Sequence, residues 1–168
     1  MAFNKMVVEK LGVSEADLVN LLVGDVGEIF STMVGIEDVQ HIPQELEAVT
    51  HFKNSVTAMV GLAGTCNGMV CVHTSQTLAL GFTAQMLGMD VSEVGDDVSD
   101  ALGEIANMVG GSFKHHLSRG GDDIKLSTPS VVTGTDYSFS SGHPGDTMTL
   151  LFNAMGEEFM VSVVLEMD

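Results

Sequence analysis

The segment SVTAMVGLAGTCNGMVCVHT, residues 55–74, constrains the fold most strongly because it reads as two β-strands joined by a short turn. Residues 55–64 and 69–74 are rich in β-branched and apolar side chains, and the asparagine–glycine pair at 67–68 is typical of a turn between adjacent strands. Strands joined this closely pair antiparallel, because a parallel pair needs a crossover of a dozen or more residues. The sequence therefore predicts an antiparallel sheet.

Other segments show the strand pattern or the period of an α-helix. Four further segments are expected to form strands, the last two joined near Gly156 as a terminal hairpin: 46–52, 127–134, 146–155 and 158–167. Three segments are expected to form helices: 14–35, 75–88 and 96–119. Residues 136–146 resemble an exposed loop. Strands and helices do not alternate strictly, so we predict a single α+β domain over residues 1–168, with helices packed on a mainly antiparallel sheet.

The composition of the chain disfavours several classes of partner and location. Six Lys and Arg against 23 Asp and Glu give a formal net charge of −17, which repels nucleic acid and anionic membrane surfaces. The N-terminus has no apolar signal region and no segment is apolar enough to span a membrane, so a cytoplasmic protein is expected. The 12 methionines are expected to fill the core. Cys66 and Cys71 fit no zinc pattern and are expected to be reduced structural thiols.

The helix expected from residue 96 onward has two faces. Its apolar residues fall on one stripe at helical spacing: Val98, Leu102, Ile105, Val109 and Phe113. A second stripe, whose centre lies roughly 160° from the first, consists of Asp100, Glu104, Asn107 and Gly111. When the apolar stripe packs on the sheet, the second stripe is expected to face outward. Metal binding by the adjacent His115 and His116 is not expected, since their rings point to different faces, and both suit the C-terminal end of the helix dipole.

The helix contains three glycines, although each lowers helix stability by roughly 1 kcal/mol relative to alanine. Gly111 lies on the polar stripe, and Gly103 and Gly110 flank it. One interpretation is that bare backbone lets another protein approach Glu104 and Asn107 closely. The other is that the glycines allow close packing inside the protein beneath a solvated polar face. The residue pattern alone leaves both open.

The central and C-terminal parts of the chain resemble the CheX chemotaxis phosphatase family, which is related to CheC and FliY. The motif of that family, Asp/Ser-x3-Glu-x2-Asn on an exposed helix, is matched completely by Asp100, Glu104 and Asn107. The resemblance runs from about residue 55 to the end. It includes VGLAGTCNGMVCV, AQMLG and, after the motif, STPSVVTG.

This resemblance implies hydrolysis of the aspartyl phosphate on a CheY-type response regulator. Asn107 would orient the attacking water, and Glu104 would pair with a lysine of the regulator. Asp100, Gly103 and Gly111 would contact the partner. Magnesium would belong to the regulator, so no cofactor is expected in this chain. The resemblance also implies a homodimer, and an unpaired strand at a sheet edge could supply its interface.

The first helix contains a weak echo of the motif. GEIFSTMVG, residues 27–35, is similar to GEIANMVGG, residues 103–111, but has Ser31 where the later copy has Asn107. The echo indicates either two halves related by a pseudo-twofold axis or a chance likeness between amphipathic helices. No catalytic role is assigned to Glu28 and Ser31. Two alternatives to an enzyme stay open: a non-catalytic module that binds a signalling or flagellar-switch protein, and a structural subunit of an oligomer.

Overall fold

The computed structural model describes residues 2–3, 9, 11–44, 49–117, 123–140 and 146–166. Within these ranges the helical elements are α2 (Glu15–Ile29), which continues into the π-helical turn η1 (Phe30–Val34), then α3 (Gln76–Leu87) and α4 (Asp96–Leu117). The strands are β1 (Ala2–Phe3), β2 (Gln40–Ile42), β3 (His51–Gly64), β4 (Asn67–Ser75), β5 (Ile124–Leu126), β6 (Ser130–Ser138), β7 (Asp146–Ala154) and β8 (Glu157–Glu166).

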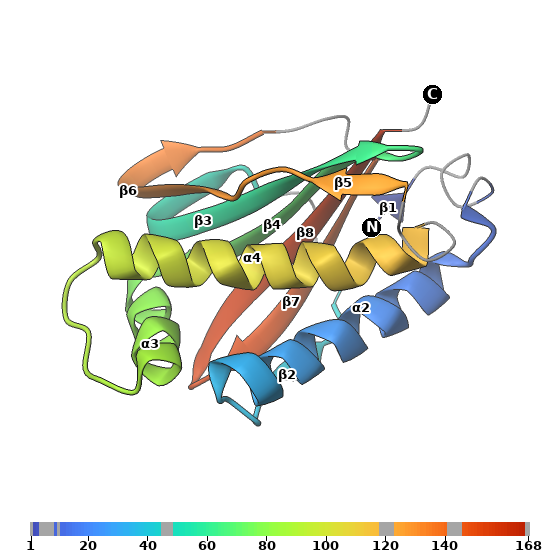
Figure 1. The fold of residues 1–168 in the computed structure, drawn as a ribbon. Helices are drawn as coiled ribbons and strands as arrows, with labels where there is room; N and C mark the ends of the chain where they lie inside the picture. Colours follow the sequence, from blue (N-terminus) through green and yellow to red (C-terminus); the bar gives the residue numbers. More distant parts are fainter. Residues whose placement is uncertain are drawn as a thin grey trace.

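The strands form one sheet, and α2, α3 and α4 lie on the same face of it (Figure 1). The strand order is β1-β7-β8-β4-β3-β5, while β2 also pairs with β7 and β6 also pairs with β3. Every ladder among the described residues is antiparallel. The predicted α+β class, with helices packed on a mainly antiparallel sheet, is confirmed.

The predicted hairpin over residues 55–74 is confirmed, but its turn lies two residues earlier than expected. The turn is formed by Thr65 and Cys66, and Asn67 already belongs to β4, where its Oδ1 accepts a hydrogen bond from the Gly64 backbone N–H at 3.1 Å. Glycine is required on both sides of this turn. A Cβ added at Gly64 would lie 1.9 Å from the carbonyl oxygen of Asp123, and one added at Gly68 would lie 2.0 Å from that of Val164.

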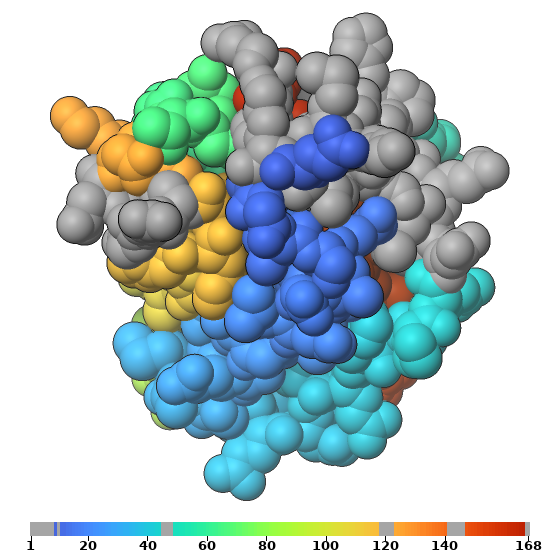
Figure 2. All heavy atoms as spheres, turned by 90° about the vertical axis from the view of Figure 1, so that its right-hand side faces the viewer, coloured from blue at the N-terminus to red at the C-terminus, as the bar shows by residue number. Residues whose placement is uncertain are grey.

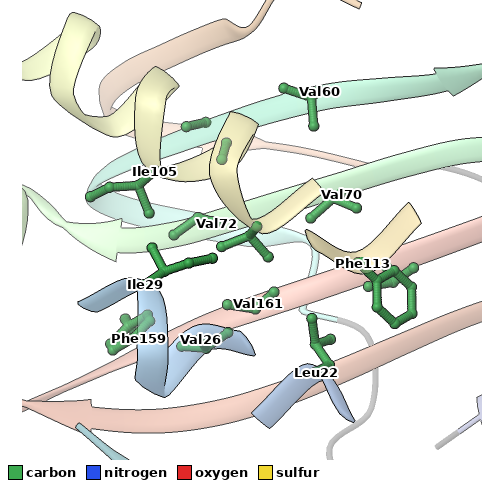
Figure 3. Packing of buried hydrophobic residues seen from close by; sticks show 14 of the residues in the cluster. Leu22, Val26, Ile29, Val60, Val70, Val72, Ile105, Phe113, Phe159 and Val161 are labelled. Carbon is green, nitrogen blue, oxygen red and sulfur yellow. The ribbon is translucent and has the colours of Figure 1, made fainter. Parts of the chain in front are cut away.

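The core lies between the helices and the sheet. All five residues of the apolar stripe of α4 are fully buried, as are Leu18, Leu22 and Val26 of α2. These helix side chains pack against alternate residues of the central strands. Figure 3 shows this for Val70 and Val72 of β4 and for Phe159 and Val161 of β8. This alternation turns one side of each strand toward the helices. Burial of each of these side chains contributes about 1.5–3 kcal/mol.

The opposite sides of the same strands carry a buried chain of hydrogen bonds. The Thr57 hydroxyl oxygen lies 2.9 Å from Nδ1 of His73 and 2.8 Å from the Tyr137 hydroxyl, and Nε2 of His73 lies 3.2 Å from the Ser162 hydroxyl. The ring of His73 also stacks on that of Phe52, with 4.5 Å between centroids. Burial lowers the pKa of His73 to about 4, so this imidazole is neutral at pH 7.

Some predicted boundaries need correction. Residues 136–138 belong to β6 and not to an exposed loop, because they pair with the first residues of β3. Of the strand predicted at 46–52, only residues 51 and 52 are in β3. Residues 45–48 lie outside the described ranges, as do 141–145 and the last two residues of the helix predicted at 96–119. The short strands β1, β2 and β5 were not predicted. Each has at most three residues, too few for a recognisable alternation.

Both cysteines are free thiols, as predicted. Cys66 packs in the core under the helices, whereas Cys71 lies on the opposite side of the sheet, where burial raises its pKa to about 12. In the described part of the chain, no helix combines the length and the apolar character needed to cross a bilayer.

Candidate active site

The motif residues are carried by α4, a helix of 22 residues that crosses the sheet. Asp96 and Asp97 lie in its first turn, and Lys114 and two histidines lie in its last turn. Negative charge at the N-terminus and positive charge at the C-terminus both stabilise the helix dipole. With its apolar stripe fully buried, α4 is a rigid support for whatever its outer face presents.

The predicted outward stripe is exposed in the structure. Asp100 and Glu104 are exposed and Asn107 is half-buried, whereas their neighbours Ile105 and Ala106 are buried. Residues three apart project from the same side of a helix, so the carboxylate of Glu104 and the carboxamide of Asn107 form one surface. Among the described residues, neither side chain has a hydrogen bond or ion pair. Their donors and acceptors are therefore available to a partner.

Gly103 does not belong to this exposed surface. It is buried, and a Cβ added there would lie 3.3 Å from Cβ of Pro129 and 3.6 Å from Cγ2 of Val131. The expectation that Gly103 contacts a partner is therefore wrong, because its bare backbone lets α4 approach the segment before β6. The contact of Pro129 could not be predicted, since nothing in the local sequence pattern signals a contact with a helix residue 26 positions earlier.

The other two glycines divide between the two interpretations. Gly110 is buried, and a Cβ there would lie 2.7 Å from Cγ2 of Val60, a distance that demands a shift of the core. Gly111 is half-buried, and its added Cβ would lie 3.8 Å from Cδ1 of Leu126, an ordinary contact. Packing thus explains Gly103 and Gly110 but places no such demand on Gly111.

The last turn of α4 is tied to α2. The two helices lie side by side at this end of the molecule (Figure 2), and Nε2 of His116 lies 2.8 Å from Oδ2 of Asp25. Burial raises the pKa of Asp25, and the contact with His116 opposes that effect. Within the described ranges, no group of three or more His, Cys, Asp or Glu side chains is placed to hold a metal ion.

The degenerate copy of the motif has a different local structure. The Ser31 hydroxyl donates to the carbonyl oxygen of Glu28 at 3.1 Å, and the Thr32 hydroxyl donates to the same oxygen at 2.7 Å. Both residues lie in η1, where the helix widens before Gly35 ends it with a left-handed φ of 90°. The Ser31 hydroxyl is thus engaged with its own backbone, and η1 carries no carboxamide at the position that corresponds to Asn107.

Comparisons with known proteins point to one family. Residues 56–153 match the model of the family described as chemotaxis phosphatase CheX. The chain is 27% identical over 128 residues to the CheY-P phosphatase CheX of Thermotoga maritima. The aligned region covers 76% of this chain and 82% of the relative.

Solved structures agree with the family match. A chemotaxis protein CheX from Desulfovibrio desulfuricans is 30% identical, with a TM-score of 0.74 over 89% of this chain and 99% of its own. CheX of Borrelia burgdorferi, solved as a CheX–CheY–BeF3–Mg2+ complex, is similar with a TM-score of 0.73 over 89% of this chain and 98% of that one. At 18% identity, this last likeness concerns the fold alone.

Proposed function

Because this chain belongs to the chemotaxis phosphatase CheX family, we propose that it hydrolyses the aspartyl phosphate of a CheY-type response regulator. The observation that carries the proposal is the exposed pair Glu104 and Asn107 on one side of a rigid helix. The relative from Thermotoga maritima is a CheY-P phosphatase, and the relative from Borrelia burgdorferi forms a complex with CheY. Both support the choice of partner.

We assign to Asn107 the role of orienting the attacking water. An acyl phosphate already has a good leaving group, so a catalyst contributes mainly by positioning an in-line water and stabilising charge. In this step the water oxygen bonds to phosphorus as the bond from phosphorus to the aspartyl oxygen breaks. The products are the free aspartate and inorganic phosphate. A carboxamide both donates and accepts hydrogen bonds and does not titrate, which suits it to hold that water.

Glu104 is assigned to partner binding. Ionised, its carboxylate makes a charge-assisted hydrogen bond with a lysine beside the phosphorylated aspartate of the regulator. This contact sets the register in which Asn107 enters the partner's site. Asp100, one turn earlier and exposed, contacts the rim of that site, and Gly111 leaves room for the partner's backbone. The magnesium ion belongs to the regulator.

A net charge of −17 opposes the approach of a phosphorylated site, and salt screens this repulsion over about 8 Å at physiological ionic strength. We therefore expect the association rate to rise as salt is added, up to the point at which the Glu104 contact is itself weakened.

A homodimer is part of the proposal, with the outer edge of β6 as its candidate interface. A single species of 17.7 kDa in light scattering at micromolar concentration would contradict it. A cytoplasmic location also stays a prediction.

The alternative function is a non-catalytic module that binds a chemotaxis or flagellar-switch protein. Phosphate release and partner affinity, measured together, separate the two. We expect Glu104→Ala to weaken both, and Ser31→Ala to change neither, since Ser31 is engaged with its own helix. If wild-type protein binds the phosphorylated receiver tightly and releases no phosphate, the module is the correct reading.

A further inference from the structure

A second surface is built without any residue of α4. It is a shallow hollow of about 500 Å³ with residues of three regions around it: Ser31, Gly35, Glu37, Asp38, Gln85 and Met155. The turn η1 and the residues after it form one side, α3 forms another, and the β7–β8 turn supplies Met155. The degenerate motif copy therefore borders this hollow through Ser31.

Large apolar side chains are exposed on the elements that border the hollow, and one of them, Met155, lines the hollow itself. Met155 is 51% exposed and Met33, in η1, is 59% exposed. At the end of α3, Leu87 and Met89 are also exposed. The expectation that methionine fills the core is thus wrong at three positions. Methionine is flexible and polarisable and adapts to different partners, so Met155 is suited to contact an apolar side chain of a partner.

The backbone at Met155 is also unusual. The β7–β8 turn places Met155 at φ 54° and Gly156 at φ 81°, and Ala154 pairs with Glu157 across it. Two positive φ angles are those of a type I′ turn, which favours asparagine followed by glycine. A bulky residue in the first position is disfavoured. Met155 therefore stands at a position whose positive φ asparagine adopts at lower cost. Local backbone strain of this kind is found at functional sites.

The charge around the hollow is of one sign. Glu37 and Asp38 line it and are exposed. The segments that build the hollow and its surroundings, residues 11–44, 76–95 and 146–166, contain no lysine or arginine. Uncompensated carboxylates beside an apolar surface attract cationic groups. A second copy of this chain would bring the same negative charge, so it suits the hollow poorly.

We propose that the hollow binds a segment of another protein in which a bulky apolar side chain is flanked by lysines or arginines. The apolar side chain packs on Met155, and the cations pair with Glu37 and Asp38. Recognition of an amphipathic segment in an apolar groove is a common mode of peptide binding. The inference does not depend on phosphatase activity, and its test measures binding alone.

The test uses a labelled synthetic peptide of leucine and lysine, patterned as an amphipathic helix, with fluorescence anisotropy as the readout. Met155→Asn is the decisive variant because asparagine suits the turn, so we expect the melting temperature to be unchanged or higher. The peptide should bind at least about tenfold more weakly, equivalent to about 1.4 kcal/mol. Replacing each lysine of the peptide with glutamate should abolish binding, and added salt should weaken it.

A matched pair of double variants separates the site from the net charge. Glu37→Lys with Asp38→Lys should weaken binding about tenfold or more. Asp17→Lys with Glu166→Lys makes the same change in net charge at the start of α2 and the end of β8, and should alter affinity by less than about twofold. Equal losses from both pairs would mean that only net charge matters, and wild-type affinity in Met155→Asn would equally overturn the proposal. A change in the sedimentation coefficient of Met155→Asn measured without peptide would also overturn the proposal, because a second copy of the chain would then be the occupant of the hollow.

Discussion

Alanine substitutions at the adjacent glycines of α4 should have opposite effects on stability. At Gly110 the new Cβ would lie 2.7 Å from Cγ2 of Val60. Val60 is fully buried and its β-branched side chain has little rotamer freedom, so it cannot easily move aside. Overpacking of this kind costs about 1–3 kcal/mol, against a gain of about 1 kcal/mol in helix propensity. We therefore expect Gly110→Ala to lower the free energy of unfolding by up to about 2 kcal/mol.

Gly111→Ala is the matched control for this prediction. Its Cβ would lie 3.8 Å from Cδ1 of Leu126, so the propensity gain of up to about 1 kcal/mol remains. Urea unfolding of both variants, followed by circular dichroism, gives the two free energies directly. The variants should differ by about 1–3 kcal/mol, or several degrees in melting temperature for a chain of this size. If Gly110→Ala is as stable as Gly111→Ala, packing does not explain Gly110.

Two further predictions concern the partner surface and pH. Gly111→Leu should melt no lower than wild type but lose most activity, because its side chain would stand beside Asn107 and hold the partner away; full activity with lower stability would show that Gly111 serves internal packing. His73 has a folded-state pKa of about 4, below its ordinary 6.5, so the unfolded chain binds a proton between these pH values that the folded chain does not. Stability from this group is complete above pH 6.5 and falls by up to about 3 kcal/mol as the pH drops to 4. His73→Gln should lack this loss, and a stability difference from wild type that does not change with pH would refute the assignment.

The sequence predicted the elements whose pattern is local. The apolar stripe from Val98 to Phe113 repeats over four turns, so both the helix and its buried face could be predicted. The exposed face followed from the same arithmetic, which is why Glu104 and Asn107 lie where they were expected. The ends of the helix predicted at 14–35 also carry local signals, because serine is typical of a helix start and glycine of a helix end. Ser14 accepts a hydrogen bond from the Asp17 backbone N–H, and Gly35 ends the helix.

What depends on distant contacts could not be predicted. The helical pattern places Gly111 on the polar stripe and Gly103 beside it, and only the position of Pro129 shows that Gly103 is buried in a tight contact. The methionine exposed at the β7–β8 turn has no local signal either, because its role depends on which elements surround it. Short strands such as β2, which gain their pairing from β7, carry too few residues to form a pattern.

The proposed function requires Asn107 to position water for hydrolysis of a partner's aspartyl phosphate. The most direct measurement is phosphate release from a phosphorylated CheY-type receiver, with this chain at about one tenth of the receiver concentration, for wild type and Asn107→Ala. We expect several turnovers per wild-type molecule, and a loss of roughly a hundredfold in the variant with an unchanged melting temperature. No acceleration by wild type, or near wild-type release by a folded Asn107→Ala, would contradict it.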